Sequence, residues 1–172
     1  WNLFDFAADG RDEGGKHGEN QKGLVTFDRS LRKDAFYLYK AAWNKHEPFV
    51  HLCGKRYANR AVEETEIKAY SNQGEVTLYV DGVKVAAQSG RTVFRFRVPL
   101  LGEHLIKAEA GEVSDVMCVR RVDAPDESYI FNKAAASVTN WFDADDLDPT
   151  CFSINDKLGD LQAHPEAGAV IN

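Results

Sequence analysis

The sequence predicts a mainly β protein, built around an immunoglobulin-like β-sandwich over residues 48–122. One strand, a long loop and one helix precede this sandwich, and a short helical tail follows it. Two observations predict the sandwich. Several short runs alternate apolar and polar residues, which is typical of half-buried antiparallel strands. Turn residues separate those runs at short intervals, as they do in sandwich domains.

The clearest strand signals lie between residues 75 and 110. VTLYV and VKVAA flank Asp81-Gly82, a pair that accommodates the positive φ angles of a tight hairpin turn. TVFRFRV and LIKAEA continue the alternation, and FVHLC, ETEIKAYS and SDVMCVRR complete about seven short strands. The chain lacks the Cys…Trp…Cys pattern of true immunoglobulin domains, so the term describes architecture only.

Residues 1–47 are predicted to hold a strand, a long loop, a strand-like step at LVTF and a helix. WNLFDFA has the length of a strand, and ADGRDEGGKHGENQKG has the glycines, charges and lack of periodicity of a loop. Asp28 is the predicted N-cap of a helix over Ser30–Trp43, which ends before Pro48. Its apolar residues recur at helical spacing at Leu31, Ala35, Leu38 and Ala42.

Residues 123–172 are predicted to form a linker and a small helical segment. SINDKLGDL predicts a short helix capped by Ser153, and Pro165 opens a second one. ASVTNWF is consistent with one more strand. The aspartates of DADDLDP predict an exposed acidic turn, because they lack the glycine and the terminal glutamate of a calcium-binding EF-hand loop.

The charge and hydropathy of the chain exclude several classes of function. With 21 basic and 27 acidic residues the formal charge is −6, so no basic field attracts nucleic acid. No apolar run approaches the roughly 20 residues of a membrane-spanning helix. The chain opens on Trp1 and has Met117 as its single methionine, so we expect a portion of a longer protein. A bacterial periplasmic, secreted or cytoplasmic location, and homo-oligomerisation, stay open.

The three cysteines give no metal or redox motif. Cys53, Cys118 and Cys151 are far apart in the sequence, without a CxxC pair and without histidines at metal-ligand spacing. Free thiols are the expectation, and a Cys53–Cys118 disulfide stays open. The sequence therefore predicts no metal site and no cofactor.

A resemblance to a known family covers Trp1 to about Trp43, roughly a quarter of the chain. WNLFDFAADGRDEG…GENQKGLVTFDRSLRKDAFYLYKAAW resembles the end of the catalytic barrel in family 2 glycoside hydrolases, the bacterial β-galactosidases in particular. In that family a (β/α)8 barrel precedes an immunoglobulin-like sandwich. The resemblance implies that residues 1–47 are the eighth barrel strand, its loop and the eighth helix. Aromatic residues would then face the barrel and the sandwich, namely Phe36, Tyr37, Tyr39 and Trp43.

The resemblance implies the C-terminal portion of a retaining β-glycosidase that hydrolyses terminal β-galactosides. Such enzymes need two carboxyl groups about 5 Å apart, a nucleophile and a general acid/base. The family carries both glutamates on earlier barrel strands, so neither catalytic residue is in this chain. Glu13 and Glu19 match no catalytic motif. The chain alone is therefore expected to be inactive.

The resemblance implies three substrate-binding residues. Trp1 would stack on the sugar ring, and the Asn20-x-Lys22 pair would contact the substrate. In the β-glucuronidase branch such a pair binds the sugar carboxylate through its N–H donors, so a β-glucuronidase is the alternative. Lys22 stands where the best-known galactosidases have a sodium-ligating Asn, and a cation cannot ligate sodium.

Two non-catalytic functions also stay open. A carbohydrate-binding sandwich would need aromatic side chains exposed on one face, and Tyr70 and Tyr79 are the candidates. Alternatively, the sandwich is a spacer that buttresses the barrel.

Overall fold

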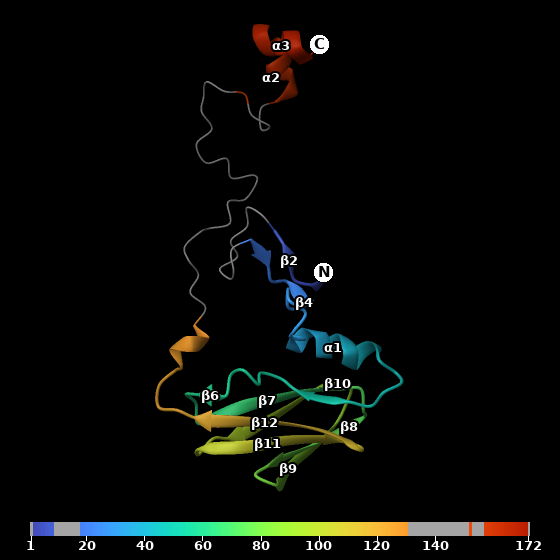
Figure 1. The fold of residues 1–172 in the computed structure, drawn as a ribbon, viewed down its shortest axis with the longest axis vertical. Helices are drawn as coiled ribbons and strands as arrows, with labels where there is room; N and C mark the ends of the chain where they lie inside the picture. Colours follow the sequence, from blue (N-terminus) through green and yellow to red (C-terminus); the bar gives the residue numbers. More distant parts are fainter. Residues whose placement is uncertain (1, 9–17, 131–151, 153–156, 172) are drawn as a thin grey trace. The chain divides into compact units, whose positions relative to one another are not determined.

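The computed structural model describes residues 2–8, 18–130, 152 and 157–171 of the chain (Figure 1). The chain divides into two compact units, residues 1–134 and 135–172, and each is described by itself. The expected strand at ASVTNWF and the aspartates of DADDLDP lie outside the described residues.

The first unit contains the predicted β-sandwich, which is confirmed. Its smaller sheet has the strand order β10-β7-β5 and contains β5 (Val50–Leu52), β7 (Glu64–Ser71) and β10 (Thr92–Pro99). Its larger sheet has the order β6-β12-β11-β8-β9 and contains β6 (Asn59–Arg60), β8 (Glu75–Val80), β9 (Val83–Ser89), β11 (Glu103–Ala110) and β12 (Val113–Arg121). Figure 1 shows the two sheets stacked as layers. The described residues contain no closed barrel.

The strand assignments agree with the alternation in the sequence, with one addition. β8 and β9 form the predicted hairpin, and Asp81 and Gly82 take φ angles of 50° and 82° at its turn. The additional strand is β6, which pairs in parallel with β12. Since β6 has two residues, it shows no periodicity from which it could be predicted.

The core lies between the two sheets and contains the apolar half of each alternating strand. On β10, Phe94 and Phe96 are buried, whereas Arg95 and Arg97 point outward and pair with glutamates of β7. Fully buried side chains include Leu52, Ile67, Val76, Leu78, Leu100, Ile106 and Val119. Burial of these side chains is the main stabilising contribution to the sandwich.

The single strand predicted for WNLFDFA is wrong: two short strands replace it. β1 (Asn2–Phe4) pairs in parallel with β4 (Gly23–Val25), and β2 (Phe6–Ala7) pairs antiparallel with β3 (Glu19–Asn20). The break falls at Asp5, which is only 5% exposed. A buried carboxylate needs partners, and its Oδ1 accepts hydrogen bonds from the Gly23 N–H at 2.8 Å and from Lys33 Nζ at 2.7 Å.

Position 23 requires glycine because the chain of β1 passes directly beside it. A Cβ atom at Gly23 would lie 2.1 Å from the backbone nitrogen of Asp5 and 2.2 Å from the carbonyl carbon of Phe4. Any other residue would push the two strands apart and break the bond to Asp5.

The helix begins later than the predicted Ser30. Helix α1 spans Asp34–Trp43 with Lys33 at the N-cap position, so the expected capping role of Asp28 is wrong. Asp28 instead closes the preceding turn, in which its carboxylate accepts bonds from Thr26 and Ser30. These bonds lower the pKa of Asp28 to about 2. The turn holds residues 26–31 outside the helix.

Helix α1 contacts β7 and β10 on the outer side of the smaller sheet (Figure 1). Tyr37 stacks on His51 of β5, with ring centroids 3.6 Å apart, and Ala41 is buried. One expectation for this helix is wrong, since Leu31 lies before it and is 43% exposed. Trp43 is 61% exposed and its ring contacts that of Tyr39. The expected contact of Trp43 with the barrel stays a prediction, because the described residues contain no barrel.

The second unit contains two short helices, α2 (Leu158–Ala163) and α3 (Pro165–Ile171). Pro165 opens α3 as predicted. Lys157 stands at the N-cap of α2, and the predicted cap Ser153 lies outside the described residues. Within the described part of the chain no helix is long and apolar enough to cross a membrane.

Two adjacent leucines provide a matched test of the core. Leu100 is fully buried and Leu101 is 85% exposed. We expect Leu100→Ala to lower the free energy of unfolding by about 2–5 kcal/mol and Leu101→Ala to change it by less than about 0.5 kcal/mol. Urea denaturation followed by circular dichroism measures both. Equal losses in the two variants would contradict the assignment of the core.

The Asp5 contacts give a second test. Asp5→Ala leaves the Gly23 N–H without its acceptor, which costs about 1–3 kcal/mol for a buried group, and leaves Lys33 Nζ only the carbonyl oxygen of Gln21. We expect faster hydrogen exchange at the Gly23 amide. Asp28→Ala is the control, since that exposed carboxylate bonds only within its own turn and should leave the Gly23 amide protected. Equal protection of Gly23 in both variants would argue against a structural role for Asp5.

Candidate functional site

Asn20 and Lys22, two of the predicted substrate-binding residues, lie together in one tight turn. Asn20 ends β3 opposite Phe6, and the residue is 2% exposed. Its Oδ1 accepts a hydrogen bond from the backbone N–H of Lys22 at 3.0 Å, the local bond of an Asx turn. Trp1 lies outside the described residues, so its predicted contact with a sugar ring stays a prediction.

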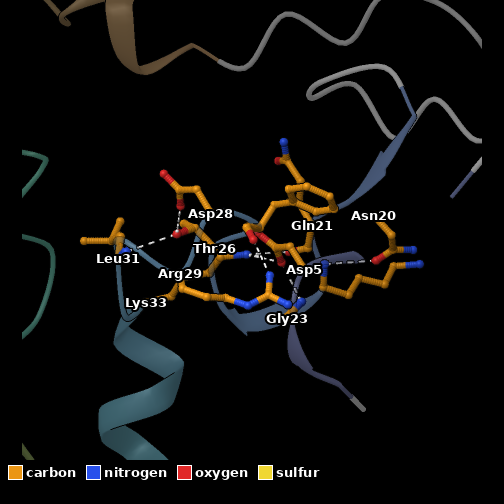
Figure 2. Close-up of polar contacts among 11 residues, drawn as sticks. Asp5, Asn20, Gln21, Gly23, Thr26, Asp28, Arg29, Leu31 and Lys33 are labelled. Carbon is orange, nitrogen blue, oxygen red and sulfur yellow. Dashed lines mark hydrogen bonds and ion pairs between the residues drawn. The ribbon is translucent and has the colours of Figure 1, made fainter. Parts of the chain in front are cut away.

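The contacts of Asp5 and Lys33 hold the turn at Gln21 and Gly23, on either side of Lys22. Lys33 Nζ donates to the carbonyl oxygen of Gln21 at 2.7 Å as well as to Asp5, while Asp5 binds the N–H of Gly23. Figure 2 shows Asp5 and Gly23 side by side, with Asn20 and Gln21 on the preceding stretch of chain. Both neighbours of Lys22 are thus fixed by hydrogen bonds. Gly23 binds the buried carboxylate of Asp5, and Gln21 binds Lys33, which itself binds Asp5.

A cavity of about 1080 Å³ lies beside this turn. It is lined by Glu19 and Gln21, by the start of α1, and by the chain after β5. Asn20 and Lys22 are not among its lining residues. The cavity and the predicted sugar contacts are therefore different surfaces of the same segment.

An ionisable cluster that sequence reasoning missed lies where α1 meets β5, with Asp34 and His51 on the cavity wall. Asp34, His51 and Cys53 each present one ligand-type atom, and these atoms lie within 4.8 Å of one another. Asp34 Oδ1 is 2.9 Å from His51 Nε2, and Asp34 Oδ2 accepts the N–H of Gly54 at 2.8 Å. Asp115 Oδ2 lies 3.7 Å from the other ring nitrogen, His51 Nδ1.

Packing shifts the ionisation of this cluster. The hydrogen bond from His51 lowers the pKa of Asp34. Burial, reinforced by the negative charge of Asp34, raises the pKa of Cys53 to about 12, so its thiol is protonated at neutral pH. Burial likewise raises the pKa of Tyr70, which is hydrogen-bonded to Cys53.

Two of the three residues of this cluster had a signal in the sequence. His51 and Cys53 are two positions apart on a strand-like run, a spacing that places both side chains on one face. Asp34 comes from a different element, and only the packing of α1 on the smaller sheet brings it to them. The prediction of no metal site depended on the absence of CxxC pairs and of histidines at metal-ligand spacing. A cluster that joins residues from α1 and β5 leaves no such pattern in the sequence.

Two other expectations can now be decided. Cys53 and Cys118 are free thiols. Cys53 follows β5 in the smaller sheet and Cys118 lies on β12 in the larger one, so the open disulfide does not form. Tyr70 and Tyr79 are likewise on different sheets, β7 and β8, and cannot form one sugar-stacking platform.

No family model matches the chain. Similar proteins nevertheless exist among curated sequences. A β-glucuronidase of Bacteroides fragilis is 50% identical over 92 residues, which are 54% of this chain and 13% of that protein.

Solved structures show the same similarity at the level of the fold. The FMN-binding β-glucuronidase of F. prausnitzii L2-6 is 48% identical with a TM-score of 0.72, over 75% of this chain and 20% of that one. A Bacteroides fragilis protein assigned as a β-galactosidase is 33% identical with a TM-score of 0.64, over 70% of this chain and 19% of that one. The chain spans a fifth or less of these relatives. Its homologues are glycoside hydrolases, and it is similar to one part of them.

Proposed function

We propose that the chain is the C-terminal portion of a retaining β-glycosidase that acts on β-glucuronides. The two glucuronidases named above are 50% and 48% identical to it, against 33% for the protein assigned as a β-galactosidase. These values favour the glucuronidase alternative over the galactosidase that the sequence first suggested.

The observation that carries the proposal is the fixed turn containing Asn20 and Lys22. An amide and an ammonium offer several N–H donors, and a carboxylate is an acceptor that forms short, charge-assisted bonds with them. The bond from the Lys22 N–H to Asn20 Oδ1 sets the spacing of the two residues. The contacts of Asp5 with Gly23 and Lys33 set the position of the turn. A turn held in place in this way lowers the entropy lost when an acidic sugar binds.

The role of this chain in the reaction is to bind and orient the sugar. Retaining hydrolysis needs two carboxyl groups about 5 Å apart, and we assign both to barrel strands that precede this chain. Under this proposal residues 1–47 are the end of that barrel, residues 48–122 the sandwich, and residues 123–172 a linker with a small helical segment. The contact of α1 with β7 and β10 supports a buttressing role for the sandwich.

Lys22→Met in the full-length enzyme tests the assignment of the carboxylate contact. A hydrogen bond to a charged group contributes about 1.5–3 kcal/mol, so kcat/KM for an aryl β-glucuronide should fall roughly 10- to 150-fold. The value for the matching aryl β-galactoside, which has no carboxylate, should change less than about threefold. Steady-state kinetics with both substrates measures the difference.

Lys84→Met is the matched control, since Lys84 is an exposed lysine on β9 in the sandwich. It should leave both kcat/KM values unchanged. If Lys22→Met lowers the two values equally, or if the unaltered enzyme prefers the galactoside, the glucuronide assignment is wrong.

The chain by itself should not hydrolyse either substrate. It binds one side of the sugar under the proposal and supplies neither catalytic carboxylate. The measurement is release of p-nitrophenol from aryl β-glucuronide and β-galactoside by the purified 172-residue chain. Hydrolysis above the buffer rate that follows the chain through two different chromatography columns would contradict the proposal that both catalytic carboxylates lie outside this chain.

A further inference from the structure

The cluster of Asp34, His51 and Cys53 combines three kinds of metal-ligating atom at one place. A carboxylate oxygen, an imidazole nitrogen and a cysteine sulfur lie within 4.8 Å of one another. Asp34 is the first residue of α1, whereas His51 lies on β5 and Cys53 follows it. The cluster therefore joins two elements that are separate in the sequence.

The distances are close to those around a tetrahedral zinc ion. Bond lengths of about 2.0–2.3 Å place the ligand atoms of such an ion roughly 3.3–3.8 Å apart. Asp34 Oδ1 and His51 Nε2 are at 2.9 Å and would move apart slightly, and the widest separation would close by roughly 1 Å. Asp34 is 45% exposed, which leaves its side chain room for the small change at His51.

The groups around His51 and Asp34 resemble those that orient the ligands of a bound metal ion. His51 Nδ1 faces the carboxylate of Asp115 at 3.7 Å, which favours a ring with Nε2 directed at the ion. Asp115 is itself fixed by the N–H of Leu52 at 2.8 Å and by Lys55 Nζ at 2.6 Å. The N–H of Gly54 holds Asp34 Oδ2 and leaves Oδ1 directed at His51. The stacked ring of Tyr37 limits rotation of the imidazole.

We propose that Asp34, His51 and Cys53 bind one zinc ion at the wall of the cavity between α1 and β5. One oxygen, one nitrogen and one sulfur ligand suit zinc, which accepts all three, better than magnesium or calcium, which require oxygen. The fourth position faces the cavity and is taken by water. On binding, the sulfur–zinc bond forms and the thiol proton of Cys53 passes to solvent. The ring proton of His51 moves from Nε2, which donates to Asp34 in the unliganded chain, to Nδ1, which faces Asp115.

The consequence of this site is structural. The ion would tie the start of α1 to β5 and thereby fix the segment that contains Asn20 and Lys22 on the sandwich. Coordination by the positive ion deprotonates the thiol of Cys53.

The test is metal binding by the chelator-treated 172-residue chain, with no activity measurement. Calorimetric titration with Zn²⁺ should show one site, and Zn²⁺ should raise the thermal unfolding midpoint. Titration with Co²⁺ should give the near-ultraviolet charge-transfer absorption of a cobalt–thiolate bond. This absorption reports a thiolate ligand in the unaltered chain, and its loss in Cys53→Ser but not in Cys118→Ser assigns the ligand to Cys53.

Matched variants identify the ligands. Cys53→Ser and His51→Gln should weaken Zn²⁺ binding at least about tenfold. Substitution of residues that only hydrogen-bond to a metal ligand already lowers affinity by about that factor, and loss of the ligand itself should cost more. Cys118→Ser and His104→Gln alter an exposed thiol and a histidine on β11 outside the cluster, and should leave affinity unchanged within about twofold. Circular dichroism establishes that each variant is folded.

Three results would overturn the proposal: no one-to-one Zn²⁺ binding, no cobalt–thiolate absorption, or equal affinity in Cys53→Ser and Cys118→Ser. None of them bears on the glucuronide assignment, which depends on Asn20 and Lys22 and is measured by kinetics.

Discussion

The buried carboxylate of Asp5 is the constraint on which the arrangement of the candidate sugar-binding segment depends. It is 5% exposed and accepts hydrogen bonds from the Gly23 N–H and from Lys33 Nζ. Its own backbone N–H donates to Val25 at 2.9 Å. One residue thus joins β1, β4 and the residue that precedes α1. A carboxylate is favourable there only because its partners compensate the loss of water.

Three features of the segment follow from this constraint. Gly23 must lack a side chain for the strands to approach. Lys33 extends toward the strands and also binds the carbonyl of Gln21. The Asn20-x-Lys22 turn is consequently fixed at both ends before any ligand arrives, which reduces the entropy lost on binding. Helix α1 then contacts the smaller sheet, where Tyr37 meets His51, so the position of the turn is coupled to that of the sandwich.

The sandwich was predictable because its signal is local: alternating burial in TVFRFRV and LIKAEA and the Asp81-Gly82 turn follow from short-range geometry. Contacts between distant residues were not predictable in this way. The bonds of Asp28 within its own turn delay the start of α1, and the bonds of Asp5 divide the first strand. Asn20 and Lys22 were predicted as sugar contacts from the resemblance to a family, which their short-range pattern alone would not indicate. His51 and Cys53 had the spacing of one strand face, but Asp34 joins them only through packing.

The central claim is that this preformed turn binds the carboxylate of an acidic sugar. The most direct measurement is a crystal structure of the full-length enzyme with a bound glucuronate-type inhibitor. We expect Lys22 Nζ and the side-chain amide nitrogen of Asn20 within about 3.2 Å of the inhibitor carboxylate oxygens, with the Asp5 contacts to Gly23 and Lys33 intact. A carboxylate held by other residues, with Asn20 and Lys22 beyond hydrogen-bond distance, would contradict the account.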